Sequence, residues 1–186
     1  PDGKEILYTI STPRTANEKP GGTYVELFKV NIETGKISNL ISGKVNVSSP
    51  QWLASGDMIS FLFKENKDVT QVWMIPASGG EKIRLTNSET SVSSYKWRPG
   101  VNQIGYLAST PETEHEKDLK SRGYGFIFYE ENLKNNNLTL ATFDNNWKLQ
   151  KTKQIPGKKT VWDFVFSPDG KKIAASMSDK NLIDYR

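Results

Sequence analysis

A long polar stretch, residues 109–124, carries the side chains whose chemistry is easiest to name. Between Thr110 and Arg122 it has four acidic and three basic residues, and it includes the single histidine of the chain, His115. Loops of this length are uncommon in compact domains and are often functional. The carboxylates of Glu112, Glu114 and Glu116 can hold an ammonium group through charge-assisted hydrogen bonds, which they cannot form equally with an acylated amine. A solvated loop, or a contact to another domain, is the alternative interpretation.

Several other chemistries are excluded by residues that the sequence lacks. The absence of Cys excludes a disulfide framework, a Cys-ligated zinc site and a cysteine nucleophile. A single His excludes a multi-histidine metal site, and we expect no cofactor. The motif Gly-x-Ser-x-Gly, which presents a nucleophilic serine on a strand–turn–helix element, does not occur. We therefore expect this chain to carry no hydrolytic activity alone.

Composition indicates a folded protein of one or at most two domains. Of its 186 residues 11% are aromatic, which is enough to build a core, and the formal net charge is +4. The lysines are scattered singly or in pairs, which favours a solvated surface over a nucleic-acid interface. No apolar run approaches the roughly 18 residues of a membrane span. The composition leaves the compartment open between bacterial cytoplasm and periplasm.

A repeat organises the chain, because three aromatic residues are each followed seven residues later by isoleucine. The pairs are Trp52 and Ile59, Trp97 and Ile104, and Phe166 and Ile173. A turn separates the members of each pair, and Asp-Gly in such a turn supplies the positive φ that a tight hairpin needs. The segment Pro1–Ile6 matches Pro168–Ile173 but has no aromatic strand before it. We therefore expect the chain to begin inside a repeat.

A second hairpin follows in each repeat, so that each repeat has four short antiparallel strands. Leu40 follows Phe28 by twelve positions, and Leu85 follows Trp73 by the same number. Four strands in about 40–50 residues are typical of a β-propeller blade. The sequence thus predicts an all-β fold, a partial β-propeller of about three blades plus part of a fourth, in one domain covering residues 1–186. The blade-like units are about 1–50, 51–95, 96–164 and 165–186.

Closed propellers have roughly 4–8 blades, so we expect the chain to be part of a longer propeller, with a four-bladed ring as the alternative. Blades are stabilised by packing against their neighbours, which predicts that Trp52, Trp97 and Phe166 lie in the core between blades. Trp73 is expected in the core and Trp147 at a partly exposed rim. The best helical candidate, Glu112–Lys120, has little apolar face, so we expect a loop there.

The segment Ser167–Ala174 (SPDGKKIA) resembles the repeat of periplasmic TolB-type propellers. It equally resembles the N-terminal propellers of prolyl oligopeptidase family serine peptidases. Two features favour the peptidase group: the charged insertion after the second strand of the third repeat resembles that of acylaminoacyl-peptidase-like members, and the segments Val161–Gly170 and Ser178–Tyr185 look like the blade that follows.

The peptidase resemblance implies a propeller that gates the access of short peptides to a catalytic α/β-hydrolase domain located C-terminal to Arg186. It also implies that Glu112, Glu114 or Glu116 holds the free amino terminus of a peptide substrate. The expected partners are thus that domain and short peptides, with no nucleic acid and no membrane span. The TolB resemblance implies instead a non-catalytic propeller that acts as a protein-interaction platform.

Overall fold

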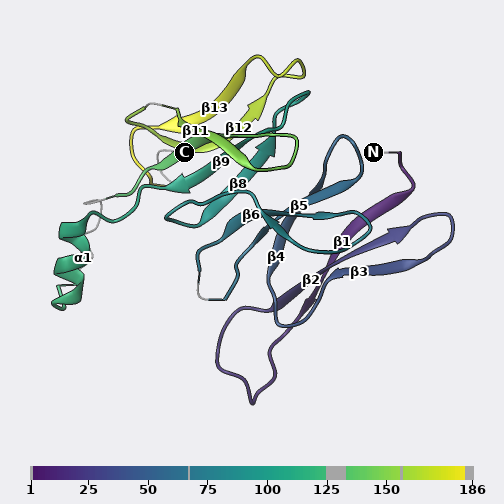
Figure 1. The fold of residues 1–186 in the computed structure, drawn as a ribbon. Coiled ribbons are helices and arrows are strands. Elements are labelled where there is room, and N and C mark those ends of the chain that lie inside the picture. The colour runs from purple at the N-terminus through teal and green to yellow at the C-terminus, as the bar shows by residue number, and fades with distance from the viewer. Residues whose placement is uncertain (1, 67, 125–132, 156, 183–186) are drawn as a thin grey trace. The chain divides into compact units, whose positions relative to one another are not determined.

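The computed structural model describes residues 2–66, 68–124, 133–155 and 157–182. Within them, every regular element except one helix is a β-strand, and the strands form four antiparallel sheets (Figure 1). The first two sheets contain β1 (Glu5–Thr12), β2 (Tyr24–Asn31) and β3 (Ile37–Ile41), then β4 (Val47–Trp52), β5 (Met58–Phe63), β6 (Gln71–Pro76) and β7 (Ile83–Arg84). The other two contain β8 (Val92–Trp97), β9 (Gln103–Ser109), β10 (Asn136–Phe143) and β11 (Leu149–Gln154), then β12 (Thr160–Phe166) and β13 (Ile173–Ser178).

Each sheet is a meander in which consecutive strands pair, as the predicted hairpins require. The second and third sheets have four strands, which confirms the predicted four-stranded antiparallel unit. The first sheet has three strands and lacks the leading strand, as the match between Pro1–Ile6 and Pro168–Ile173 indicated. The unit boundaries at residues 51, 96 and 165 stay a prediction; strands β4, β8 and β12 begin at Val47, Val92 and Thr160.

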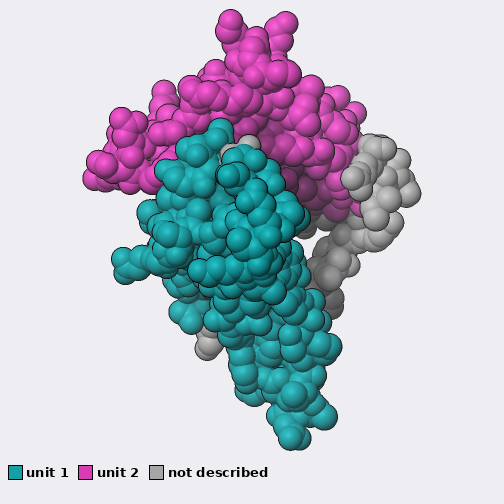
Figure 2. Space-filling model, turned by 90° about the vertical axis from the view of Figure 1, so that its right-hand side faces the viewer, with its two compact units in different colours: residues 1–87 teal, residues 88–186 magenta. Residues whose placement is uncertain are grey.

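The chain forms two compact units, residues 1–87 and 88–186, which Figure 2 colours teal and magenta. In the first unit, the faces of the first and second sheets bury a common core around Leu27, Ile59 and Phe61, each 0% exposed. All six residues of β5 are buried, because this strand is covered on both faces. Trp73 lies in this core and Trp52 packs against its edge, which confirms both assignments.

In the second unit, the third and fourth sheets pack through Leu107, Leu138, Val161 and Phe164, and Phe166 covers this cluster as predicted. Close approach is possible because β9 has Gly105 opposite the ring of Phe164; a Cβ atom there would lie 2.7 Å from Phe164 Cε2.

Three aromatic side chains pack together at one end of the third sheet. Trp97 packs against Phe143 of β10 and against Trp147 in the turn between β10 and β11, with ring centroids 6.2 and 5.8 Å away. Trp97 and Trp147 are both half-buried. The predicted partial exposure of Trp147 is therefore confirmed, whereas the predicted position of Trp97 in the core between blades stays a prediction.

The prediction of a loop at Glu112–Lys120 is wrong, because residues Glu114–Ser121 form helix α1 in the connection between β9 and β10. None of its residues is buried, so the helix is stabilised by its own caps and ion pairs and not by an apolar face. Among the described residues, no helix has the length and apolar character needed to cross a membrane.

The contact between Gly105 and Phe164 gives a stability prediction. Gly105→Ala should lower the free energy of unfolding by about 2 kcal/mol, because the added methyl group overlaps a ring that is only 1% exposed and cannot move aside. Chemical denaturation followed by tryptophan fluorescence measures this change. Gly22→Ala is the matched control, since a Cβ atom there meets nothing within 4 Å. Equal stability of the two variants would contradict the close packing of the third and fourth sheets.

Candidate functional site

The candidate site is the charged segment between β9 and β10, which contains α1 and the three glutamates proposed from the sequence. Helix α1 begins at a capping box. The Thr113 hydroxyl accepts a hydrogen bond from the Glu116 backbone N–H, and the Glu116 carboxylate accepts one from the Thr113 backbone N–H at 2.6 Å. This arrangement satisfies two amide groups that a helix start leaves without partners. The helix therefore forms here although its surface is almost entirely polar.

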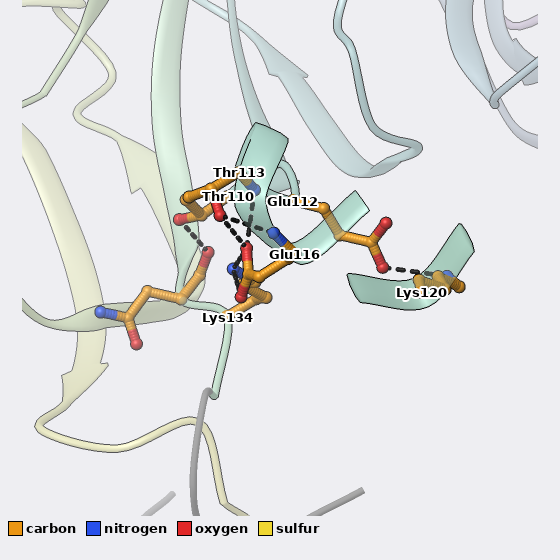
Figure 3. Close-up of polar contacts among 7 residues, drawn as sticks. Thr110, Glu112, Thr113, Glu116, Lys120 and Lys134 are labelled. Carbon is orange, nitrogen blue, oxygen red and sulfur yellow. Dashed lines mark hydrogen bonds and ion pairs between the residues drawn. The ribbon is translucent and has the colours of Figure 1, made fainter. Parts of the chain in front are cut away.

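Lysines of the same connection pair with all three glutamates (Figure 3 shows two of these pairs). Lys120 Nζ lies 3.0 Å from Glu112 Oε1, and Lys117 Nζ lies 2.7 Å from Glu114 Oε1. Glu116 is bound more extensively, because Lys134 Nζ donates to both of its carboxylate oxygens at 2.6 Å. Lys134 directly precedes the residues that lead into β10, so this ion pair ties the start of the helix to the sheet.

The three carboxylates differ in solvent exposure, and this difference decides which of them can bind a ligand. The Glu114 side chain is 90% exposed, whereas that of Glu116 is 29% exposed and serves as a helix cap. A carboxylate that caps a helix and pairs with a lysine has few lone pairs left for a ligand. Glu114, whose partner Lys117 is itself 49% exposed, can exchange that partner for another cation at the lowest cost. Substrate binding by Glu112, Glu114 or Glu116 stays a prediction.

The network around Glu116 changes its ionisation. The hydrogen bond from Lys134 and those from the backbone and side chain of Thr113 lower the pKa of Glu116 from 4.5 to about 2. Because the folded-state pKa lies below the unfolded value, the ionised carboxylate stabilises the segment above pH 4.5. That stabilisation is lost as the pH falls from about 4.5 to about 2.

This ionisation can be measured directly. In an NMR titration of the side-chain carboxyl carbons, Glu116 should titrate near pH 2, and the α1 amide signals should lose helical character over the same range. Lys134→Met should move the Glu116 midpoint upward, because it removes the largest cause of the shift. Lys148→Met, a change of the same charge on another connection, should leave it in place. A Glu116 titration midpoint that is the same with and without Lys134→Met would contradict the ion pair between Glu116 and Lys134.

The sequence does contain a signal that favours a helix over the expected loop. Thr113 followed three residues later by Glu116 is a capping-box spacing, and it identifies the start of α1. The partner Lys134 carries no comparable signal, because it is 18 residues from Glu116 along the chain. Among the described residues, no three His, Cys, Asp or Glu side chains come together in a way that could hold a metal ion.

Comparison with known proteins gives partial matches to longer proteins. The chain is 32% identical over 69 residues to the uncharacterized protein YidR of Escherichia coli, covering 35% of the chain and 16% of YidR. It is 25% identical over 118 residues to the uncharacterized peptidase YuxL of Bacillus subtilis, covering 63% of the chain and 18% of YuxL. It is 26% identical over 102 residues to the Tol-Pal system protein TolB of Francisella tularensis, covering 53% of the chain and 22% of TolB. No family model matches the sequence.

Solved structures match more of the chain. A complex of acylaminoacyl peptidase superposes with a TM-score of 0.64 at 14% identity, covering 95% of this chain and 27% of the peptidase. TolB from Agrobacterium tumefaciens superposes with a TM-score of 0.53 at 15% identity, covering 82% of this chain and 45% of TolB. The chain has the fold of the propeller domains of prolyl oligopeptidase-family peptidases and of TolB-like proteins. The predicted all-β partial propeller is thus confirmed. The chain spans about a fifth of the length of the curated relatives and less than half of each of these two structures.

Proposed function

We propose that the chain is part of the propeller of a prolyl oligopeptidase-like serine peptidase, where it gates the access of short peptides to a catalytic α/β-hydrolase domain. The observation that supports this most is the superposition on acylaminoacyl peptidase, which extends over 95% of the chain. The alignment with the peptidase YuxL covers more of the chain than the alignment with TolB does, 63% against 53%.

Closely packed sheets suit this gating role, because a rigid propeller would exclude folded proteins. In the first unit β5 is buried along its whole length, and in the second unit Phe164 lies directly against the backbone of β9 at Gly105. Such a propeller would admit to the catalytic domain only molecules small enough to pass its openings. It would also keep bulk water from a catalytic centre and strengthen the electrostatic interactions there.

The experiment uses the full-length protein that contains this chain. It should react with a fluorophosphonate probe, cleave short chromogenic peptides and leave a folded protein substrate intact. The control is the same protein after pretreatment with a serine-directed inhibitor, which should abolish both labelling and cleavage. No labelling and no peptide cleavage would overturn the peptidase proposal.

Within this proposal, Glu114 is the carboxylate best placed to bind the free amino terminus of a peptide. Glu114→Ala should raise KM for free-amine peptides by about fivefold more than for N-acylated peptides of the same sequence, because only the free amine forms the charge-assisted hydrogen bond. Glu81→Ala, another single charge removal outside α1, is the matched control. Equal changes in KM for the two peptide series would count against amine binding by Glu114.

The alternative is a TolB-like, non-catalytic propeller that acts as a protein-interaction platform. It is favoured by the alignment with TolB of Francisella tularensis, which covers 102 residues of the chain. The probe experiment separates the two functions, since a platform without a catalytic serine would show neither labelling nor cleavage. Recovery of a stable protein complex from the same preparation would then support the alternative.

A further inference from the structure

The first unit contains a polar cavity of about 580 Å³ that none of the functions above uses. It lies where three connections of that unit meet: β1 to β2, β3 to β4, and β5 to β6. Lys82, just before β7, completes one wall. A cavity of this volume is within the range of sites that bind small molecules.

Positive charge dominates the lining. Four cationic side chains, Arg14, Lys44, Lys64 and Lys82, line the cavity, and Glu65 is the one acidic residue among the described residues that do so. The lining therefore carries a net charge of +3, from four positive charges and one negative charge. Glu18, outside the lining, pairs with Lys44 at 2.6 Å and reduces the local balance to +2. Most of these cationic side chains are exposed, and a cluster of like charges raises the local concentration of anions.

The guanidinium group of Arg14 is held in place before any ligand arrives. Its Nε donates to the Gly22 carbonyl at 2.8 Å, its Nη1 donates to the Tyr24 hydroxyl at 3.1 Å, and the group lies 4.6 Å from the centre of the Tyr24 ring. A Cβ atom at Gly21 would lie 2.8 Å from Arg14 Nε, so the glycine makes this position possible. A fixed guanidinium group loses little conformational entropy when it binds an oxyanion.

The lysines differ in how far their charges are already compensated. Glu18, whose pKa is lowered to about 2 chiefly by its hydrogen bond with Lys44, is ionised and neutralises that lysine. Lys82 lies over the Phe63 ring at 4.4 Å and 3.5 Å from Glu65 Oε1. Lys64 forms no ion pair within the described part of the chain. Lys64 and Arg14 are thus the lining cations whose charges no ion pair compensates within the described residues.

From this geometry we infer that the cavity binds a small polyanion through Arg14 and Lys64, with Lys44 and Lys82 as flanking charges. The ligand class is a compact molecule with several oxyanion groups, either phosphates or carboxylates, because guanidinium and ammonium groups donate charge-assisted hydrogen bonds to both. The rings of Tyr24 and Phe63 line the cavity, where they make cation–π contacts with Arg14 and Lys82. The inference concerns residues 1–87 alone and does not depend on the peptidase proposal.

Isothermal titration calorimetry of the full-length protein tests this site, with tripolyphosphate and citrate as the two probes at low ionic strength. At least one probe should bind with 1:1 stoichiometry, and the tighter of the two identifies the oxyanion type. Lys64→Gln should weaken binding about fivefold, and Arg14→Gln combined with Lys64→Gln should weaken it more than about twentyfold. Gly21→Ala retains every charge but displaces the guanidinium group, and it should also weaken binding.

Lys36→Gln is the matched control, because it removes one charge at the β2–β3 turn, at the opposite end of the first sheet. It should change the affinity by less than about twofold, the range expected of a distant surface charge. The circular dichroism spectrum of each variant should equal that of the parent, which separates a lost site from a lost fold. Failure of both probes to bind, or equal weakening by Lys36→Gln and Lys64→Gln, would overturn the inference.

Discussion

The fold depends on the packing of one antiparallel sheet face against the next. A four-stranded meander has two faces, and a single such sheet cannot bury both of them alone. In the first unit this constraint is met by a shared core around Leu27, Ile59 and Phe61. In the second unit it is met by Phe164 against Gly105, where a glycine lets a ring touch the strand backbone. Strand residues that face these cores are therefore fixed by packing.

The connections are free of that constraint, and both polar regions of interest occur in them. The β9–β10 connection forms α1, which buries no residue and so contributes nothing to the core. The β1–β2 connection places Arg14 at the cavity of the first unit, held by the Gly22 carbonyl and the Tyr24 hydroxyl. Function is expected in such connections, because they can change without disturbing the packed sheets.

The sequence predicted the strands and hairpins well, since each depends on local signals. The isoleucine seven residues after Trp52, Trp97 and Phe166, and the turns between them, reflect strand pairing that is local in the chain. The helix was missed because its apolar face is absent, although its capping box was present in the sequence. The cationic cavity could not be predicted, since Arg14, Lys44, Lys64 and Lys82 converge only after two sheets pack.

The two polar regions differ in how their charges are satisfied, and this difference decides what each can recognise. In the β9–β10 connection Glu112, Glu114 and Glu116 each have a lysine partner within the same segment, so binding an external amine exchanges one ion pair for another. Such an exchange between exposed groups gains little free energy. At the cavity, Lys64 has no ion pair within the described residues and Arg14 is already oriented, so an anion gains new contacts without displacing old ones. We therefore expect charge recognition by this chain to be stronger at the cationic cavity than at the acidic helix.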